Sequence, residues 1–358
     1  MLSSSHLAYA AGMASLVVIG WVGGMVIAPY MGALLQKFRF WKPKKRTFAS
    51  DGASMPIVAS QTESEINTPR AGGLIIWIIP CIIASILWLG AQIMPHGFIA
   101  RLNFVTRGQT WLPLFTLCVG GIIGFIDDWT VVKGMGKYIG GGLTARVRIS
   151  LVIVMAAIGA WWFYEKLEWS SIYIPFFGLW DMGWLFVPFF IIVMLSTFSS
   201  GVVDGVDGLS GGVFATIFTS FAALAIVRGQ YQLAGLCLVI VGVLLAYLWW
   251  NVPPALFYMG ETGILALTTT LTVVAFLTQG VFLLPLIGSV LVMEAGSSII
   301  QLLSKKFRGK KVFLAAPIHH HFQALGWPAP QVTMRLWVIS GLSGLVGVGI
   351  AIWSGIIQ

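Results

Sequence analysis

Long apolar stretches alternate with short polar segments along the whole chain. Ten of the stretches are candidate membrane spans: 7–35, 71–94, 111–126, 149–164, 184–199, 210–228, 232–250, 263–282, 284–303 and 336–357. A helix needs roughly 20 apolar residues to cross the hydrocarbon layer, so the third to fifth stretches should extend into their loops. Strands are not expected, because an open sheet edge cannot be satisfied in lipid. The pattern predicts an all-α integral membrane protein, a bundle of about ten transmembrane helices that forms one domain over residues 1–358.

Composition indicates a membrane protein, and the distribution of charge indicates its orientation in the membrane. The chain is 58% hydrophobic and 9% charged, whereas soluble domains have about 25% charged residues. Loops 36–70, 127–148 and 304–335 hold seventeen Lys and Arg residues, and the opposite side holds four. Lys and Arg gather on the cytoplasmic side of membrane proteins, so we expect both termini outside. The net charge of +9 then reflects topology and attraction to anionic headgroups, with no nucleic acid partner.

Segment 165–183 connects two spans on the side that is poor in Lys and Arg. It carries several aromatic residues, among them Trp169, Tyr173, Phe176 and Trp180. Such side chains favour the membrane–water interface. We therefore interpret this segment as an interfacial belt on the outer face.

Two adjacent carboxylates, Asp127 and Asp128, end the third span. They repel each other, and the nearby hydrocarbon disfavours their ionised forms. A divalent metal, or the cations Lys133 and Arg146, should compensate them. One carboxylate could bind a metal while the other accepts a proton; the alternative is a solvated pair that caps a helix.

Asp204 and Asp207 lie between the fifth and sixth spans, in a segment with glycines at 201, 205 and 208. Glycine lets a backbone approach a ligand closely, and residues three apart share a face on a helical turn. The segment is therefore a candidate substrate site. The alternative is a tight turn in which Asp207 caps the next helix.

Glu261 stands just before the eighth span, after Asn251 and Tyr258. A lone acid beside hydrocarbon is costly without a partner. Mg²⁺ would neutralise it, because this ion prefers oxygen ligands, and Tyr258 could stack on a base. The alternatives are a glutamate favoured by a helix dipole and an interfacial tyrosine.

His319, His320 and His321 form the fourth motif, between the last two spans. Consecutive side chains on a helix cannot all point one way, so at most two should share a site. Imidazoles suit zinc, but nearby carboxylates favour a hard ion, which leaves the histidines for phosphate contacts. A polar surface loop is the alternative. All four motifs lie on the side rich in Lys and Arg, which indicates an enzyme that joins a charged, water-soluble substrate to a lipid.

The motifs occur in the order of a known family. The chain resembles the phospho-N-acetylmuramoyl-pentapeptide transferases (the MraY family), within the polyprenyl-phosphate N-acetylhexosamine-1-phosphate transferase superfamily. The strongest stretch is Pro317-Ile318-His319-His320-His321-Phe322 followed by Gly326-Trp327-Pro328, with Arg335 and Trp337 beyond. The resemblance covers nearly the whole chain, most closely from about residue 284 onward.

The resemblance implies an activity and a location. The activity would be Mg²⁺-dependent transfer of phospho-N-acetylmuramoyl-pentapeptide from UDP-N-acetylmuramoyl-pentapeptide to undecaprenyl phosphate. Its products would be UMP and lipid I, for peptidoglycan synthesis. The location would be the bacterial inner membrane, crossed several times, with the active site facing the cytoplasm. The oligomeric state, monomer or homodimer, stays open.

The resemblance also implies roles for the motif residues. The metal ligands would be Glu261, Asp127 and Asp128, and the catalytic residues would be Asp127, Asp128, Asp204, His319 and His320. Substrate would be bound by Thr68, Lys133, Arg146, Asp207, Asn251, Tyr258, Gln301 and His321. Phosphoryl transfer depends mostly on positioning and charge neutralisation, and the lipid phosphate is already a nucleophile.

The chain departs from the family pattern at several of these motifs. The family's Thr-Pro-Thr-Met-Gly-Gly appears as Thr68-Pro69-Arg70-Ala71-Gly72-Gly73, without the usual lysine a few residues upstream. Glu261 replaces a metal-binding aspartate, and Gly201 and Val203 replace an asparagine and a threonine. Three readings follow: a divergent enzyme, a changed nucleotide-sugar specificity, or a non-catalytic paralogue. A transporter or lipid flippase is a fourth, although transporter sites tend to lie at the bilayer midplane between repeats.

Overall fold

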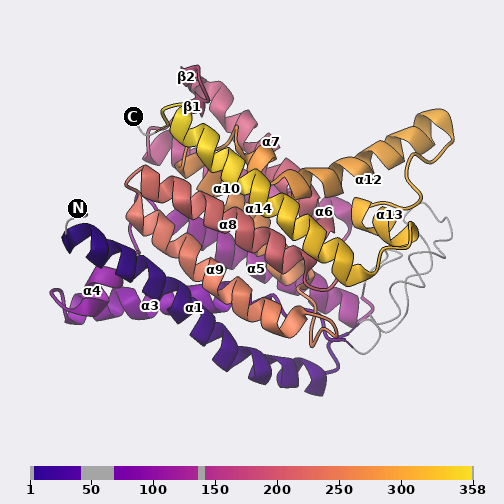
Figure 1. Cartoon of the computed structure of the whole chain (residues 1–358), viewed down its shortest axis with the longest axis horizontal. Helices are drawn as coiled ribbons and strands as arrows, with labels where there is room; N and C mark the ends of the chain where they lie inside the picture. Colours follow the sequence, from indigo (N-terminus) through magenta and orange to yellow (C-terminus); the bar gives the residue numbers. More distant parts are fainter. Residues whose placement is uncertain (1–3, 42–67, 136–141, 357–358) are drawn as a thin grey trace.

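A bundle of long helices makes up the computed structural model, which describes residues 4–41, 68–135 and 142–356 (Figure 1). Nine helical segments within these ranges are long and apolar enough to cross a membrane. Their helices are α1 (Ser4–Lys37), α3 (Leu74–Ile93), α5 (Trp111–Val132), α6 (Ala145–Trp161), α7 (Phe186–Ser199), α8 (Leu209–Val227), α9 (Tyr231–Asn251), α10 (Gly260–Leu277) and α14 (Ala329–Trp353). The predicted all-α membrane class is confirmed.

Shorter elements extend or connect these helices. The π-helical turn η2 (Trp162–Lys166) prolongs α6, and the 3-10 turns η3 (Gly183–Leu185) and η4 (Ser200–Val203) flank α7, so these short spans do reach into their loops. The short helix α4 (Phe98–Leu102) follows α3, and α11 (Leu284–Ile287), α12 (Ser289–Arg308) and α13 (Ile318–Ala324) precede α14. The basic residues Lys42, Lys44, Lys45, Arg46 and Lys137 lie outside the described residues.

The predicted span 284–303 is wrong. Gly288 separates α11 from α12, and α12 protrudes from the bundle (Figure 1). Its buried positions include Glu294, Ser297, Gln301 and Ser304, whereas Val292, Ile299, Ile300, Leu302, Leu303 and Phe307 are exposed. The run looked uniformly apolar because polar residues that share one helical face are spread evenly along the sequence. α12 is therefore an amphipathic helix whose polar side faces the protein.

The expectation that strands are absent is also wrong for one segment. β1 (Ser171–Ile174) and β2 (Gly178–Asp181) form an antiparallel hairpin. The hairpin lies between two spanning segments, where water can satisfy its edges. Phe176 and Trp180 on it are exposed. The start of α1 and the end of α14 lie at the same end of the bundle as the hairpin, and α12 and α13 lie at the other end (Figure 1).

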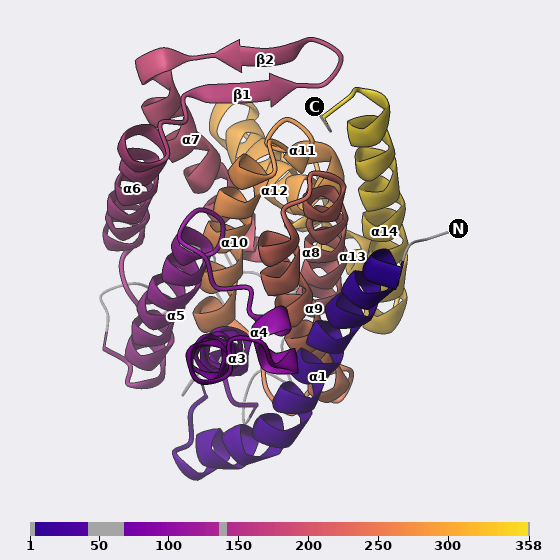
Figure 2. The ribbon, with the colours of Figure 1, turned by 90° about the vertical axis from the view of Figure 1, so that its left-hand side faces the viewer.

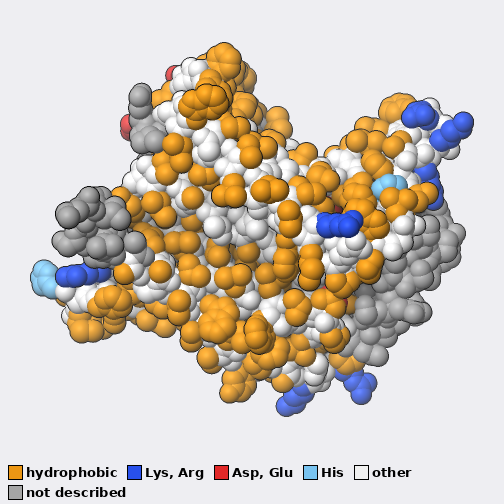
Figure 3. Space-filling model, viewed as in Figure 1, with side chains coloured by type: hydrophobic (Ala, Val, Ile, Leu, Met, Phe, Trp, Pro, Cys, Tyr) orange, Lys and Arg blue, Asp and Glu red, His pale blue; other side chains and the backbone are white. Residues whose placement is uncertain are grey.

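The centre of the bundle is α10. Every residue from Thr262 to Leu277 is buried, which is typical of a helix that is hydrophobic on all sides. Helices α5, α7, α3 and α8 pack against it, with α1, α6 and α14 further out (Figure 2). On the face seen in Figure 3, hydrophobic side chains cover the middle of the bundle, and Lys and Arg lie toward its ends.

Glycines set the distance between α5 and α10. A Cβ at Gly120 would lie 2.9 Å from the carbonyl oxygen of Leu265, and one at Gly124 would lie 2.1 Å from that of Glu261. Small residues four apart let membrane helices approach closely. This close approach brings the end of α5, with its two aspartates, to the start of α10.

The α5–α10 contact can be tested with Gly120→Ala. The added methyl group would push the helices apart, so we expect the free energy of unfolding to fall by about 1–3 kcal/mol. Denaturant or thermal unfolding of the purified protein measures this. Gly341→Ala on α14 is the matched control, since no neighbouring atom lies within 4 Å of its Cβ position. Equal loss of stability in both variants would contradict the role given to this contact.

Candidate active site

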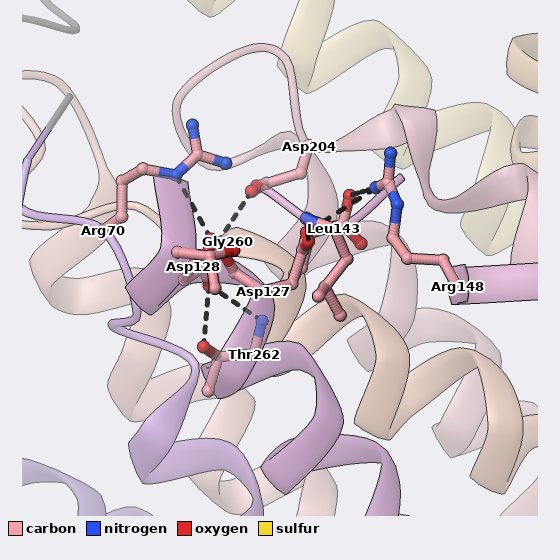
Figure 4. A network of polar contacts seen from close by, with 10 residues as sticks. Arg70, Asp127, Asp128, Leu143, Arg148, Asp204, Gly260 and Thr262 are labelled. Atoms are coloured by element: carbon pink, nitrogen blue, oxygen red, sulfur yellow. Dashed lines mark hydrogen bonds and ion pairs between the residues drawn. The ribbon is translucent and has the colours of Figure 1, made fainter. Parts of the chain in front are cut away.

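The N-terminus of α10 gathers acidic side chains from two other segments (Figure 4). The first N–H groups of a helix have no partner inside it. Asp128 Oδ2 accepts hydrogen bonds from Thr262 N at 2.9 Å and Thr262 Oγ1 at 2.7 Å. Asp204 Oδ2 accepts one from Gly260 N at 3.0 Å. Because a helix N-terminus favours anions, this capping explains why the two aspartate motifs meet here.

Gly260 makes the capping sterically feasible. Its φ is +69°, and a Cβ at this position would lie 2.3 Å from Asp128 Oδ2. The left-handed backbone and the missing side chain both require glycine. The glycine in Met259-Gly260-Glu261 is therefore required by the local structure.

The loop that carries Asp204 and Asp207 is tied down from several sides. Asn251 Oδ1 accepts from Gly208 N at 2.8 Å, and Asn251 Nδ2 donates to the carbonyl of Phe257 at 2.9 Å. Burial raises the pKa of Asp207, and the N–H of Ala255 opposes this by donating to its carboxylate. Asn251 and Asp207 thus join the loop to the segment before α10.

Asp204, within this loop, is half-buried. Burial raises its pKa above the ordinary value, and the hydrogen bond from Ser210 Oγ at 2.8 Å opposes that rise. The amide of Gly260 acts in the same direction as Ser210. The surroundings therefore hold Asp204 as a hydrogen-bond acceptor between two segments.

Two arginines face the acids. Arg70 Nε lies 3.3 Å from Asp128 Oδ1, and Arg148 Nη1 lies 2.8 Å from Glu261 Oε1 and 3.7 Å from Asp127 Oδ2. These side chains are only 20% and 22% exposed, so their charges act in a partly desolvated place. In Figure 4 they approach the acids from opposite sides.

The sequence analysis gave this cationic role to Lys133 and Arg146, and the structure places both at the surface. Lys133 Nζ lies 5.2 Å above the ring of Trp129. Thr144 caps α6, so Arg146 and Arg148 both fall in its first turn. They project about 200° apart around the helix, which a helical projection of 144–148 would have revealed.

The carboxylate oxygens of Asp127 and Glu261 are suitable ligands for a hard divalent cation. Asp127 Oδ1 accepts from Leu143 N at 2.6 Å, and its Oδ2 faces the same guanidinium as Glu261. Carboxylate oxygens suit Mg²⁺, which keeps several waters. Within the described ranges, no three His, Cys, Asp or Glu side chains are arranged to hold a metal. Further ligands of such an ion would therefore be water and substrate oxygens.

Asp128 is engaged differently from its neighbour. Its Oδ1 faces Arg70 and its Oδ2 accepts two hydrogen bonds from Thr262. The side chain is fully buried. This arrangement suits a residue that holds α10 and Arg70 in place.

The histidines of the fourth motif face different partners. His319 is fully buried, with Nδ1 2.7 Å from Oε2 of Glu294. His320 Nδ1 lies 2.9 Å from Oε1 of Gln323, and His321 Nδ1 accepts from Leu314 N at 3.2 Å. The sequence analysis missed Glu294. An acid inside an apparent span is costly without a partner, and the nearby imidazoles were the signal.

The remaining candidates border the cluster or support its backbone. Tyr258 N donates to the carbonyl of Pro69 and Gly72 N to that of Tyr258, both at 2.8 Å, so Thr68 and Tyr258 reach the same edge as Arg70. Gln301 lies on α12, where its Oε1 accepts from the amides of Val312 and Phe313. In this structure Gln301 holds a loop.

Comparisons with known proteins agree with the motifs. Residues 110–279 match the model of glycosyl transferase family 4, a segment that includes all the acids of the cluster. The phospho-N-acetylmuramoyl-pentapeptide-transferase of Geobacillus thermodenitrificans (strain NG80-2) is 32% identical over 293 residues, which is 81% of this chain and 86% of that protein. The resemblance predicted from the motifs is confirmed. With this identity over most of both chains, the protein is an enzyme that belongs to the phospho-N-acetylmuramoyl-pentapeptide transferase family.

Proposed function

We propose that this protein transfers phospho-N-acetylmuramoyl-pentapeptide from its UDP carrier to undecaprenyl phosphate, with release of UMP and formation of lipid I. The reaction would take place at the cytoplasmic face of the bacterial inner membrane and would require Mg²⁺. The observation that carries this proposal is the charge cluster at the N-terminus of α10 (Figure 4).

The charge balance of the cluster supports a divalent cation. Four carboxylates face two guanidinium groups, which leaves an excess of two negative charges when all are ionised: Asp127, Asp128, Asp204 and Glu261 against Arg70 and Arg148. Both substrates are anionic, so such an excess would repel them. One divalent cation offsets it.

Each group at the cluster has a task in this proposal. Mg²⁺, when bound, would supply positive charge to offset that of the diphosphate. Asp127 and Glu261 would hold the ion, and Arg148 would pair with phosphate oxygens, for which a guanidinium is well shaped. The lipid phosphate needs orientation and the loss of any remaining proton.

The loop of Asp204 and Asp207 would serve the uridine and sugar side. Tyr258 is half-buried and lies at the edge of the cluster, where its ring could stack on a base. Thr68 comes from the neighbouring segment. Arg70 belongs to a motif in which this chain departs from the family pattern, and its side chain reaches the cluster itself. This departure favours a changed nucleotide-sugar specificity as the second candidate function.

The direct test is an assay with purified protein, UDP-N-acetylmuramoyl-pentapeptide, undecaprenyl phosphate and Mg²⁺. We expect UMP release and a lipid-linked product, both abolished by EDTA and restored by added Mg²⁺. Parallel reactions with other UDP-sugars test the specificity. Product from another sugar alone would replace the substrate assignment, and substrate binding without UMP release would identify a non-catalytic paralogue.

Glu261 can be tested by removing its charge and by shortening it. Glu261→Gln should lower kcat by about 10²–10³ and raise the Mg²⁺ concentration needed, because a neutral amide is a poor ligand for a hard ion. Glu261→Asp should retain activity. The exposed Glu165→Gln at the opposite end is the control. Turnover near the wild-type rate in Glu261→Gln would take Glu261 out of the metal site.

Asp128→Asn tests the buried ion pair. The asparagine oxygen can still accept from Thr262, so we expect insertion and folding to persist. The charge that pairs with Arg70 is lost, so UMP release should fall to background. Gel filtration in detergent checks the fold. A variant that folds and turns over normally would show that this charge is dispensable.

A further inference from the structure

The polar face of α12 holds successive points of the chain between α12 and α13. Buried Glu294, Ser297, Gln301 and Ser304 recur every three or four residues, so they share one face of the helix. Ser304 Oγ donates to the carbonyl of Lys310 at 2.9 Å, and Gln301 accepts from Phe313 N at 3.0 Å. Glu294, which is nearest the bundle, pairs with His319 on α13.

The Glu294–His319 pair is fully enclosed. Both side chains are 0% exposed, and the Nδ1–Oε2 distance is 2.7 Å. A carboxylate on one ring nitrogen of a histidine fixes the orientation of the ring and keeps the proton on that nitrogen. The direction in which the other ring nitrogen points is therefore set by Glu294.

That other nitrogen points at the aspartate loop. His319 Nε2 is buried and has no hydrogen-bond partner among the described residues. A Cβ at Gly205 would lie 2.3 Å from Nε2 and 2.7 Å from Cε1 of the same ring. The imidazole thus packs directly on the backbone of Gly205, beside Asp204.

The two ends of this loop are supported differently. The carbonyl of Asp207 accepts from Thr333 Oγ1 at 3.1 Å, and that of Gly208 accepts from Trp337 Nε1 at 3.1 Å, so α14 holds the second half. The first half has the His319 ring on one side and the N-terminus of α10 on the other.

We propose that Glu294 is a positioning residue that acts through His319: it holds the imidazole against Gly205 and so fixes the loop of Asp204 and Asp207 over the start of α10. Its kinetic consequence rests on the proposed function, in which that loop serves the nucleotide-sugar substrate. A ring released from Glu294 would either collide with Gly205 or remove the support on one side of the first half of the loop.

The test compares Glu294→Leu, which has similar volume but no acceptor, with Glu294→Gln, which keeps an acceptor oxygen. Hydrogen–deuterium exchange is measured on the full chain without substrate. We expect faster exchange in peptides covering 200–209 for Glu294→Leu, recovery of most of the protection in Glu294→Gln, and no change in 171–183. Ser297→Ala is the matched control, because among the residues that the structure describes this buried hydroxyl bonds only to the backbone of its own helix.

Kinetics give the second readout. Glu294→Leu should lower kcat/KM for the UDP-linked substrate about tenfold, mostly through KM, and Glu294→Gln should restore most of it. Unchanged exchange at 200–209 in Glu294→Leu, or equally faster exchange in every peptide, would overturn the proposal. If the exchange pattern appears but no protein, wild type included, transfers the phospho-sugar, the proposed function fails and the positioning role stands.

Discussion

The site depends on the unpaired N–H groups at the start of α10. This helix is buried along nearly its whole length, so water cannot easily satisfy them, and a buried polar group without a partner is costly. Asp128 and Asp204 satisfy them from two other segments. The same hydrogen bonds that complete the helix therefore bring the acids together, and the fold and the site share one set of contacts.

The negative charge of acids that lie this close together must be offset by positive charge nearby. The dipole of α10 supplies part of it, and Arg70 and Arg148 supply more. The arginines come from the segment before α3 and from α6, so the cluster joins elements that are distant in sequence. Because the remaining charge is negative, the site is suited to work with a cation when it receives anionic substrates.

The sequence predicted the features that depend on local composition. It did not predict the features that depend on the direction in which a side chain projects from its helix. Apolar runs located the nine spanning segments, and counting charges placed the motifs at one end. The same counting could not show that the polar residues of 284–303 share a face, nor that Arg148 and not Arg146 turns inward. Glu294 was hidden because it was averaged into an apolar window. The hairpin at 171–181 was missed because the rule against strands applies only within hydrocarbon.

The shape of α12 has a consequence for how the enzyme sits in its bilayer. Val292, Leu302 and Phe307 are exposed, and acyl chains would cover these apolar side chains at low cost. Lys305, Lys306 and Arg308 in its last turn are drawn to anionic headgroups. An apolar outer side together with a basic last turn suits a helix that lies at the boundary between hydrocarbon and headgroups. Through Glu294 and His319 the same helix contacts the aspartate loop, so one element connects the lipid-facing surface to the candidate active site.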